Sequence, residues 1–127
     1  MDFINQEVFD YISKHSEDEP QLLEELNRET HQKILQPRML SGSFQGRVLS
    51  LLSHLIRPKK ILEIGTYTGY SALCLAEGLA KNGQLHTIDC NEELVDFQKS
   101  YFNRSQYKDC IIQHLGNAVD LIPQIDE

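Results

Sequence analysis

The residues with the clearest capacity for chemistry lie between positions 60 and 71, in the sequence Lys-Ile-Leu-Glu-Ile-Gly-Thr-Tyr-Thr-Gly-Tyr-Ser. An apolar run that ends at Ile64 predicts a buried parallel strand, interrupted only by Glu63. Gly65 and Gly69 then predict a tight turn in which a ligand can approach the backbone, and an apolar helix follows. A strand, a glycine turn and a helix N-terminus together form the nucleotide-binding unit of α/β proteins. The alternative is a plain turn that binds nothing.

A second candidate is Asp89, which ends the next predicted strand, residues 84–89. It follows Gly65 by about two dozen residues, near the spacing of the acid that binds a ribose in nucleotide-binding folds. A carboxylate suits this role because it accepts hydrogen bonds from both ribose hydroxyls. The alternative is that Asp89 caps the helix predicted over residues 92–102. Asn91 fills that role equally well, so we favour ribose binding.

The glycine spacing excludes two common nucleotide-binding motifs. It lacks the Gly-x-Gly-x-x-Gly of dinucleotide enzymes and the Lys-Ser/Thr of a P-loop. Instead, Glu-Ile-Gly-Thr-Tyr-Thr-Gly-Tyr-Ser resembles the first motif of S-adenosylmethionine (SAM) methyltransferases, in particular the metal-dependent O-methyltransferases of the catechol and caffeoyl-CoA type. The resemblance implies that Asp89 holds the ribose and that Ser71 bonds the cofactor carboxylate. The residues it implies around the methionine part are Glu63, Gly65, Tyr67, Gly69 and Ser71.

Residues 39–46, Met-Leu-Ser-Gly-Ser-Phe-Gln-Gly, are similar to a family segment that folds over the methionine end of SAM and the acceptor pocket. The resemblance implies binding roles for Met39, Ser41 and Gln45. The alternative is a helix start capped by Ser41 or Ser43, and the two interpretations are compatible.

A strand predicted over residues 110–115 is followed by Gly116-Asn-Ala-Val-Asp. In the family, a small residue and a backbone N–H of this turn meet the adenine. Gly116 and Ala118 are the matching positions, and simple turn chemistry is the alternative. His114 has no partner acid in the sequence and is interpreted as an ordinary strand histidine.

Amphipathic helices precede the first strand. Apolar residues at helical spacing predict helices over residues 3–14, over residues that begin near Pro20, and over a third segment whose apolar side carries Phe44, Val48, Leu51, Leu52 and Leu55.

The predicted strands and helices together indicate the α/β fold class. The resemblance implies a Rossmann-like SAM-methyltransferase fold with a parallel sheet and an N-terminal helical preface. We expect one partial domain, with the preface over residues 1–57 and a cofactor-binding half over residues 58–127.

Composition limits the function classes. The 127 residues are 40% hydrophobic and 24% charged, as in a soluble single domain, and the net charge is −7. That charge argues against a nucleic-acid surface, which needs clustered Lys and Arg. The N-terminus does not resemble a signal peptide, and no apolar run is long enough to span a membrane, so we expect a cytoplasmic protein. Cys74, Cys90 and Cys110 indicate buried thiols rather than disulfides or a zinc site.

The resemblance covers nearly all of the chain but only about the first three-fifths of a complete family member. It implies that a fourth strand would bring the first metal-binding aspartate and the catalytic lysine. We therefore expect the cofactor-binding portion of an O-methyltransferase, with no catalytic or metal-binding residue of its own and no activity alone. The divalent metal and the hydroxyl acceptor, a small aromatic or a CoA ester, belong to a complete parent.

Two alternatives come from other classes. An NAD-type oxidoreductase is disfavoured by the glycine pattern, and a non-catalytic SAM- or nucleotide-binding or assembly module stays open. In the family's strand order, strand one lies between strands two and four. Without strand four it becomes an open edge that pairs with another chain, so we expect a homo-oligomer.

Overall fold

Three parallel strands form the sheet of this chain, in the order β1-β2-β3. The strands are β1 (Lys60–Ile64), β2 (Gln84–Asp89) and β3 (Ile111–Leu115). The computed structural model describes residues 4–126. The parallel α/β sheet is confirmed. The prediction for β2 is correct to the residue, because Gly83 and Asp89 bound its apolar alternation.

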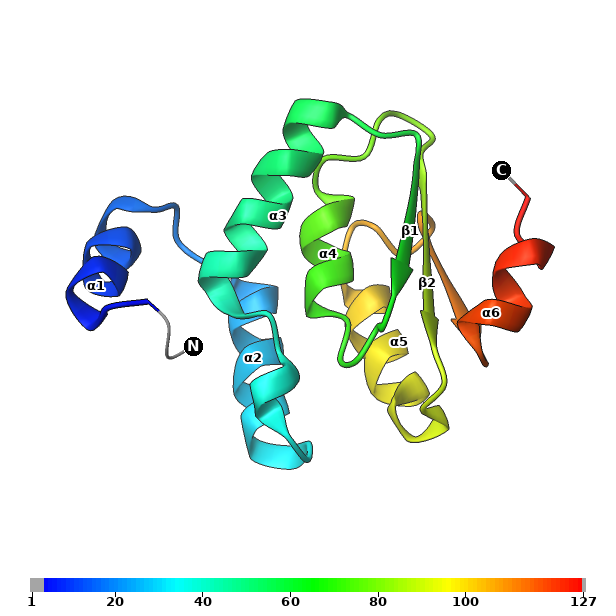
Figure 1. The fold of residues 1–127 in the computed structure, drawn as a ribbon, viewed down its shortest axis with the longest axis horizontal. Coiled ribbons are helices and arrows are strands. Elements are labelled where there is room, and N and C mark those ends of the chain that lie inside the picture. Colours follow the sequence, from blue (N-terminus) through cyan, green and yellow to red (C-terminus); the bar gives the residue numbers. More distant parts are fainter. Residues whose placement is uncertain (1–3, 127) are drawn as a thin grey trace.

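The helices precede β1, connect the strands or follow β3. They are α1 (Gln6–His15), α2 (Gln21–Lys33), α3 (Gly42–Ile56), α4 (Tyr70–Ala76), α5 (Val95–Arg104) and α6 (Ala118–Leu121), with 3-10 turns η1 (Pro37–Met39), η2 (Glu92–Leu94) and η3 (Ile122–Gln124). In Figure 1, α3, α4 and α5 lie on one side of the sheet, α6 lies on the other, and α1 lies furthest from it. Phe3, part of the first predicted helix, is outside the described residues.

The core lies between α2, α4, α5 and the sheet. Leu23 and Leu26 of α2 are 3% and 0% exposed, and they pack in one cluster with Tyr70 and Tyr101. Each tyrosine hydroxyl donates a hydrogen bond to a glutamate. The Tyr70 hydroxyl donates to Glu19, just before α2, and the Tyr101 hydroxyl donates to a glutamate of α2. These bonds hold α2 against α4 and α5.

Helix α3 packs on α4 through small residues, not through the apolar side predicted from the sequence. Gly46, Ser50 and Ser53 are buried, and the Ser53 hydroxyl donates to the Leu75 carbonyl oxygen at 2.6 Å. A Cβ on Gly78 would lie 2.3 Å from the Ser53 carbonyl carbon. The two backbones therefore touch, an approach that larger side chains would prevent.

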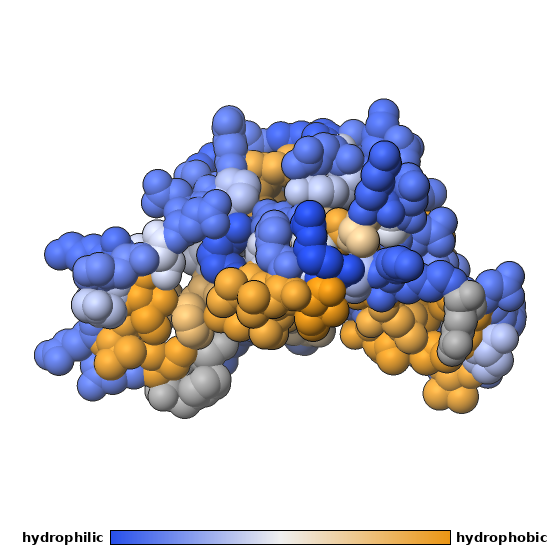
Figure 2. Space-filling view, turned by 90° about the horizontal axis from the view of Figure 1, so that it is seen from above, coloured by the Kyte–Doolittle hydropathy of each residue, from blue (hydrophilic) through white to orange (hydrophobic). Residues whose placement is uncertain are grey.

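The predicted apolar stripe of α3 is instead exposed. Val48, Leu51 and Leu55 are 39%, 58% and 72% exposed. The apolar run of β1 predicted a buried strand, and this is wrong for Leu62 and Ile64, which are 49% and 64% exposed. The physical reason is that no other described strand pairs with β1 on its far edge. The other expectation, that this strand is an open edge of the sheet, is met among the described residues. Figure 2 shows apolar side chains gathered along one side of the molecule.

The cysteines and histidines differ partly from expectation. Cys74 is buried, and burial raises the pKa of its thiol to about 12, so the thiol is neutral at physiological pH. Cys110 is half-buried, but Cys90 is exposed, so the prediction of a buried thiol was wrong there. His114 stacks on His86, with 2.9 Å between His86 Nδ1 and His114 Nε2. It is thus a strand histidine whose partner is another histidine.

Candidate cofactor-binding site

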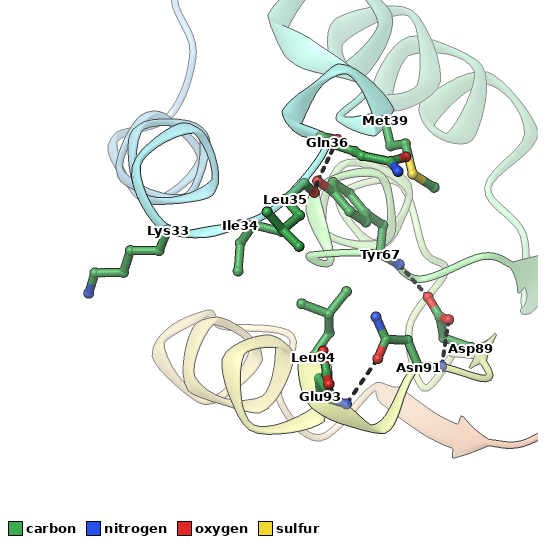
Figure 3. Close-up of a pocket in the computed structure, with 10 residues that line it drawn as sticks. All are labelled: Lys33, Ile34, Leu35, Gln36, Met39, Tyr67, Asp89, Asn91, Glu93 and Leu94. Atoms are coloured by element: carbon green, nitrogen blue, oxygen red, sulfur yellow. Dashed lines mark hydrogen bonds between the residues drawn. The ribbon is translucent and has the colours of Figure 1, made fainter.

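A pocket of about 530 Å³ opens at the C-terminal end of β2, where open α/β sheets bind their ligands. Its volume is within the range of small-molecule sites. It is lined by Lys33, Ile34, Leu35, Gln36, Met39, Tyr67, Asp89, Asn91, Glu93 and Leu94. In Figure 3, residues 33–39 and residues 89–94 lie on opposite sides of Tyr67. The structure therefore brings three of the predicted residues, Met39, Tyr67 and Asp89, to one cavity.

The Asp89 carboxylate is oriented by two main-chain N–H groups. Its Oδ2 accepts from Tyr67 N at 2.7 Å and its Oδ1 accepts from Asn91 N at 3.1 Å. The helical cap is Asn91, whose side chain accepts from Glu93 N at 3.0 Å. The capping alternative for Asp89 is therefore wrong. Each carboxylate oxygen has further lone-pair capacity, which suits a ligand with two adjacent hydroxyls.

Tyr67 joins the glycine turn to the segment that follows α2. Its hydroxyl lies 3.0 Å from the Leu35 carbonyl oxygen and 2.8 Å from that of Gln36, and its single proton serves one of them at a time. Burial raises the pKa of the Tyr67 phenol. Tyr67 has φ +49° and Gln36 has φ +57°, so both residues adopt the left-handed conformation that non-glycine residues seldom adopt.

The two glycines of the turn serve different purposes. Gly65 has φ +97°, and a Cβ there would meet no atom within 4 Å, so the backbone is open to an approaching ligand. Gly69 has φ +95°, and a Cβ there would lie 2.7 Å from the Phe102 ring. Gly69 thus leaves room for packing against α5.

Glu63 and Ser71 are paired with each other beneath the turn. Ser71 Oγ donates to Glu63 Oε2 at 2.5 Å, and Thr87 Oγ1 donates to Glu63 Oε1 at 2.7 Å. Burial raises the pKa of Glu63, and these two hydrogen bonds partly offset that rise. Because the Ser71 proton is directed to Glu63, Ser71 must turn away from Glu63 before it can donate to a ligand carboxylate.

The remaining predicted residues are not among those that line the pocket. Ser41 occupies the N-cap position of α3 but makes no side-chain capping bond, so the capping alternative does not hold for Ser41. Gly116 N donates to the Asp89 carbonyl oxygen at 2.9 Å, which ties the end of β3 to the end of β2. Ala118 begins α6, which Asn117 caps by accepting from Val119 N at 2.9 Å.

Several pocket residues were not identified from the sequence. The segment Lys33–Gln36 and Leu94 line the cavity. Nothing local in the sequence indicated that the segment after α2 would face Asp89 from more than fifty positions away. Gln98, whose Nε2 donates to the Tyr67 carbonyl oxygen, carried no sequence signal either.

Residues 4–126 contain neither a cluster of metal ligands nor a helix suited to a membrane. No group of three His, Cys, Asp or Glu side chains is placed to hold a metal ion. No helix in that range has the length and apolar character needed to cross a membrane.

Comparison with known proteins identifies the family. A family model described as O-methyltransferase matches residues 13–127. The chain is 35% identical over 83 residues to the catechol O-methyltransferase of Niastella koreensis, a match that covers 65% of this chain and 38% of that protein. It is 34% identical over 107 residues to the caffeoyl-CoA O-methyltransferase of Zinnia elegans, covering 84% of this chain and 43% of that protein.

A solved structure supports the same assignment. The O-methyltransferase from Bacillus cereus, in complex with SAH, matches with a TM-score of 0.84 and 31% identity, covering 94% of this chain and 54% of that one. This chain therefore spans about half the length of the proteins that it matches. With its parallel sheet, its glycine turn and these matches, the chain belongs to the O-methyltransferase family and has the Rossmann-like fold of that family.

Proposed function

We propose that this chain is the cofactor-binding portion of a SAM-dependent O-methyltransferase, which methylates a hydroxyl of a small aromatic or CoA-ester acceptor. One observation carries the proposal: Asp89 ends β2 in a pocket, with its carboxylate oriented by the N–H groups of Tyr67 and Asn91. The open backbone at Gly65 and the Bacillus cereus relative in complex with SAH support it.

The proposed cofactor has three parts that need different partners. Asp89 accepts hydrogen bonds from the ribose hydroxyls. The turn after β1, with Glu63 below it and Met39 across the pocket, surrounds the methionine part. The turn after β3 meets the adenine. The proposed binding residues are Met39, Ser41, Glu63, Gly65, Tyr67, Gly69, Ser71, Asp89, Gly116 and Ala118.

The reaction of the complete protein is an in-line transfer of the sulfonium methyl group to an acceptor oxygen. A divalent metal, where one is bound, lowers the pKa of the acceptor hydroxyl. Residues 4–126 do not hold three side chains that fit a metal, so the proposal gives this chain no metal-dependent step. Its own residues bind and orient the cofactor, a contribution that works through positioning.

Isothermal titration calorimetry of the 127-residue chain tests the proposal. We expect S-adenosylhomocysteine to bind and NADH to give no heat of binding. Binding of NADH without S-adenosylhomocysteine would instead favour the oxidoreductase alternative. A longer protein that contains this chain, binds S-adenosylhomocysteine and transfers no methyl group would favour the alternative of a non-catalytic binding module.

We also propose that the chain forms a homo-oligomer. Within residues 4–126, no strand pairs with the far edge of β1, and Leu62 and Ile64 beside it are exposed. An apolar edge of this kind pairs readily with another strand. The only charged residue inside its apolar run is Glu63, which is turned into the molecule and half-buried.

A further inference from the structure

We propose that Gln98 is a positioning residue of the cofactor site, which fixes the backbone of Tyr67 and thereby the carboxylate of Asp89. The inference rests on the proposed function, because it assigns Gln98 a purpose in cofactor binding. Gln98 lies on α5, does not line the pocket, and is hydrogen-bonded to the Tyr67 backbone.

The amide of Gln98 bridges the turn and the sheet. Its Nε2 donates to the Tyr67 carbonyl oxygen, and its Oε1 accepts from Gln113 Nε2 at 2.8 Å. Gln98 is 2% exposed, so water does not replace these bonds if they are lost. Gln113 is fixed in turn by β3, where it is in register with Thr87 of β2.

Tyr67 is held on both sides of its Cα atom. The N–H before it donates to Asp89 Oδ2 at 2.7 Å, and the C=O after it accepts from Gln98. The peptide before Tyr67 is also held through the Thr66 carbonyl oxygen, which accepts from Gly69 N at 2.8 Å. Together these bonds restrain φ and ψ at a residue whose φ of +49° is intrinsically unfavourable for a tyrosine. Without the bond from Gln98, the peptide after Tyr67 can rotate about ψ of Tyr67. The unfavourable φ can then relax, and this relaxation shifts the preceding peptide, whose N–H orients Asp89.

The chemistry of this position requires a neutral group that both donates and accepts. A glutamine does both through one planar amide. A leucine of similar size would leave the Tyr67 carbonyl and the Gln113 amide buried without partners. A glutamate would place an acceptor oxygen, or a buried charge, against a carbonyl oxygen. The residue type therefore matches the task of holding this turn.

The experiment compares Gln98→Leu with a matched control, Ser53→Ala. Ser53 is 3% exposed and also donates to a main-chain carbonyl, that of Leu75, but it lies on α3 and does not line the pocket. We titrate S-adenosylhomocysteine into wild type and both variants at a temperature where all are folded. We expect Gln98→Leu to bind at least tenfold more weakly and Ser53→Ala to bind within twofold of wild type.

A second readout needs no ligand. Hydrogen exchange at the Tyr67 amide reports its bond to Asp89, and we expect exchange to quicken at least tenfold in Gln98→Leu, relative to the Leu85 amide in the central strand. Ser53→Ala should leave that ratio unchanged. If Gln98→Leu does not fold, Gln113→Leu takes its place; it removes only the bond to Gln98 Oε1, so a smaller effect of the same sign is expected.

Two results would overturn the inference. One is equal affinity for S-adenosylhomocysteine in Gln98→Leu and wild type. The other is an unchanged ratio of Tyr67 to Leu85 amide exchange in Gln98→Leu, or in Gln113→Leu where that variant takes its place. If wild type itself does not bind S-adenosylhomocysteine, the proposed function fails, and the exchange ratio still decides separately whether Gln98 fixes the turn.

Discussion

The main-chain N–H of Tyr67 donates to Asp89 Oδ2 at 2.7 Å, and this bond links the glycine turn after β1 to the end of β2. The two predicted binding elements are thus in contact before any ligand arrives. A site with preset geometry loses less conformational freedom when it binds, which favours affinity.

Replacement of Asp89 by alanine tests the ribose contact. Asp89→Ala removes the acceptor of two ribose hydrogen bonds, each assisted by the carboxylate charge, so we expect a loss of roughly 2–4 kcal/mol of binding free energy. This corresponds to an S-adenosylhomocysteine dissociation constant about 30- to 1,000-fold higher by calorimetry. Asp96→Ala is the control, because Asp96 is an exposed acid of α5 that does not line the pocket. An unchanged constant in Asp89→Ala would remove Asp89 from the site.

The 127-residue chain should not transfer methyl groups. The residues proposed for this chain bind the cofactor. Within residues 4–126, no three His, Cys, Asp or Glu side chains are placed together to hold a metal ion. We expect no product above background in a radiolabelled-methyl assay with SAM and a catechol, with or without Mg²⁺. Metal-dependent turnover by this chain would mean that another group of acids activates the acceptor.

Self-association should depend on the edge of β1. We expect the amides of residues 61–64 to gain protection from hydrogen exchange as the protein concentration rises. Leu62→Lys should weaken association, because an edge lysine opposes strand pairing. Val8→Lys is the control, since Val8 is 51% exposed but lies on α1. A monodisperse wild-type monomer at high concentration, with a two-state melt, would contradict this prediction.

The packing of α3 predicts opposite effects at two positions. Gly78→Ala puts a methyl group 2.3 Å from the Ser53 backbone, so we expect the free energy of unfolding to fall by about 2 kcal/mol or more. Leu55→Ala alters a side chain that is 72% exposed, and we expect a change within about 0.5 kcal/mol. Urea denaturation measures both. A large loss at Leu55 with none at Gly78 would mean that the apolar side of α3 faces the core.

Glu63 should make stability depend on pH. Burial raises the pKa of Glu63 above its ordinary value of 4.5, so the folded chain keeps this proton at pH values where the unfolded chain has lost it. The contribution of Glu63 to stability is therefore present at low pH and is lost as pH rises from 4.5 through the raised pKa. Glu63→Gln removes this titration. The free energy of unfolding of the variant, relative to wild type, should rise across that range and then level off; a difference independent of pH would contradict the assignment.

Local chemistry in the sequence determined the strands, the glycine turn and the acid of the site. The pattern that ends at Asp89 predicted β2 to the residue, and Gly65 adopts a conformation that glycine readily supplies. Asn91 was correctly identified as a residue that could cap the helix in place of Asp89. A cap of this kind can be predicted from the sequence, because the side chain bonds a main-chain N–H only two residues further along. Such features depend on neighbours in the chain, and the sequence displays those directly.

Tertiary structure alone decided which surfaces meet. Helical spacing identified an apolar side of α3, but the side that packs is the one where Gly46 and Ser53 allow α4 to come close. Likewise, Ser71 is directed to Glu63, and Gln98 reaches Tyr67 from 31 positions away. Periodicity describes a surface and not its partner, because the partner comes from a distant part of the chain and is selected by shape and by the need to satisfy buried polar groups.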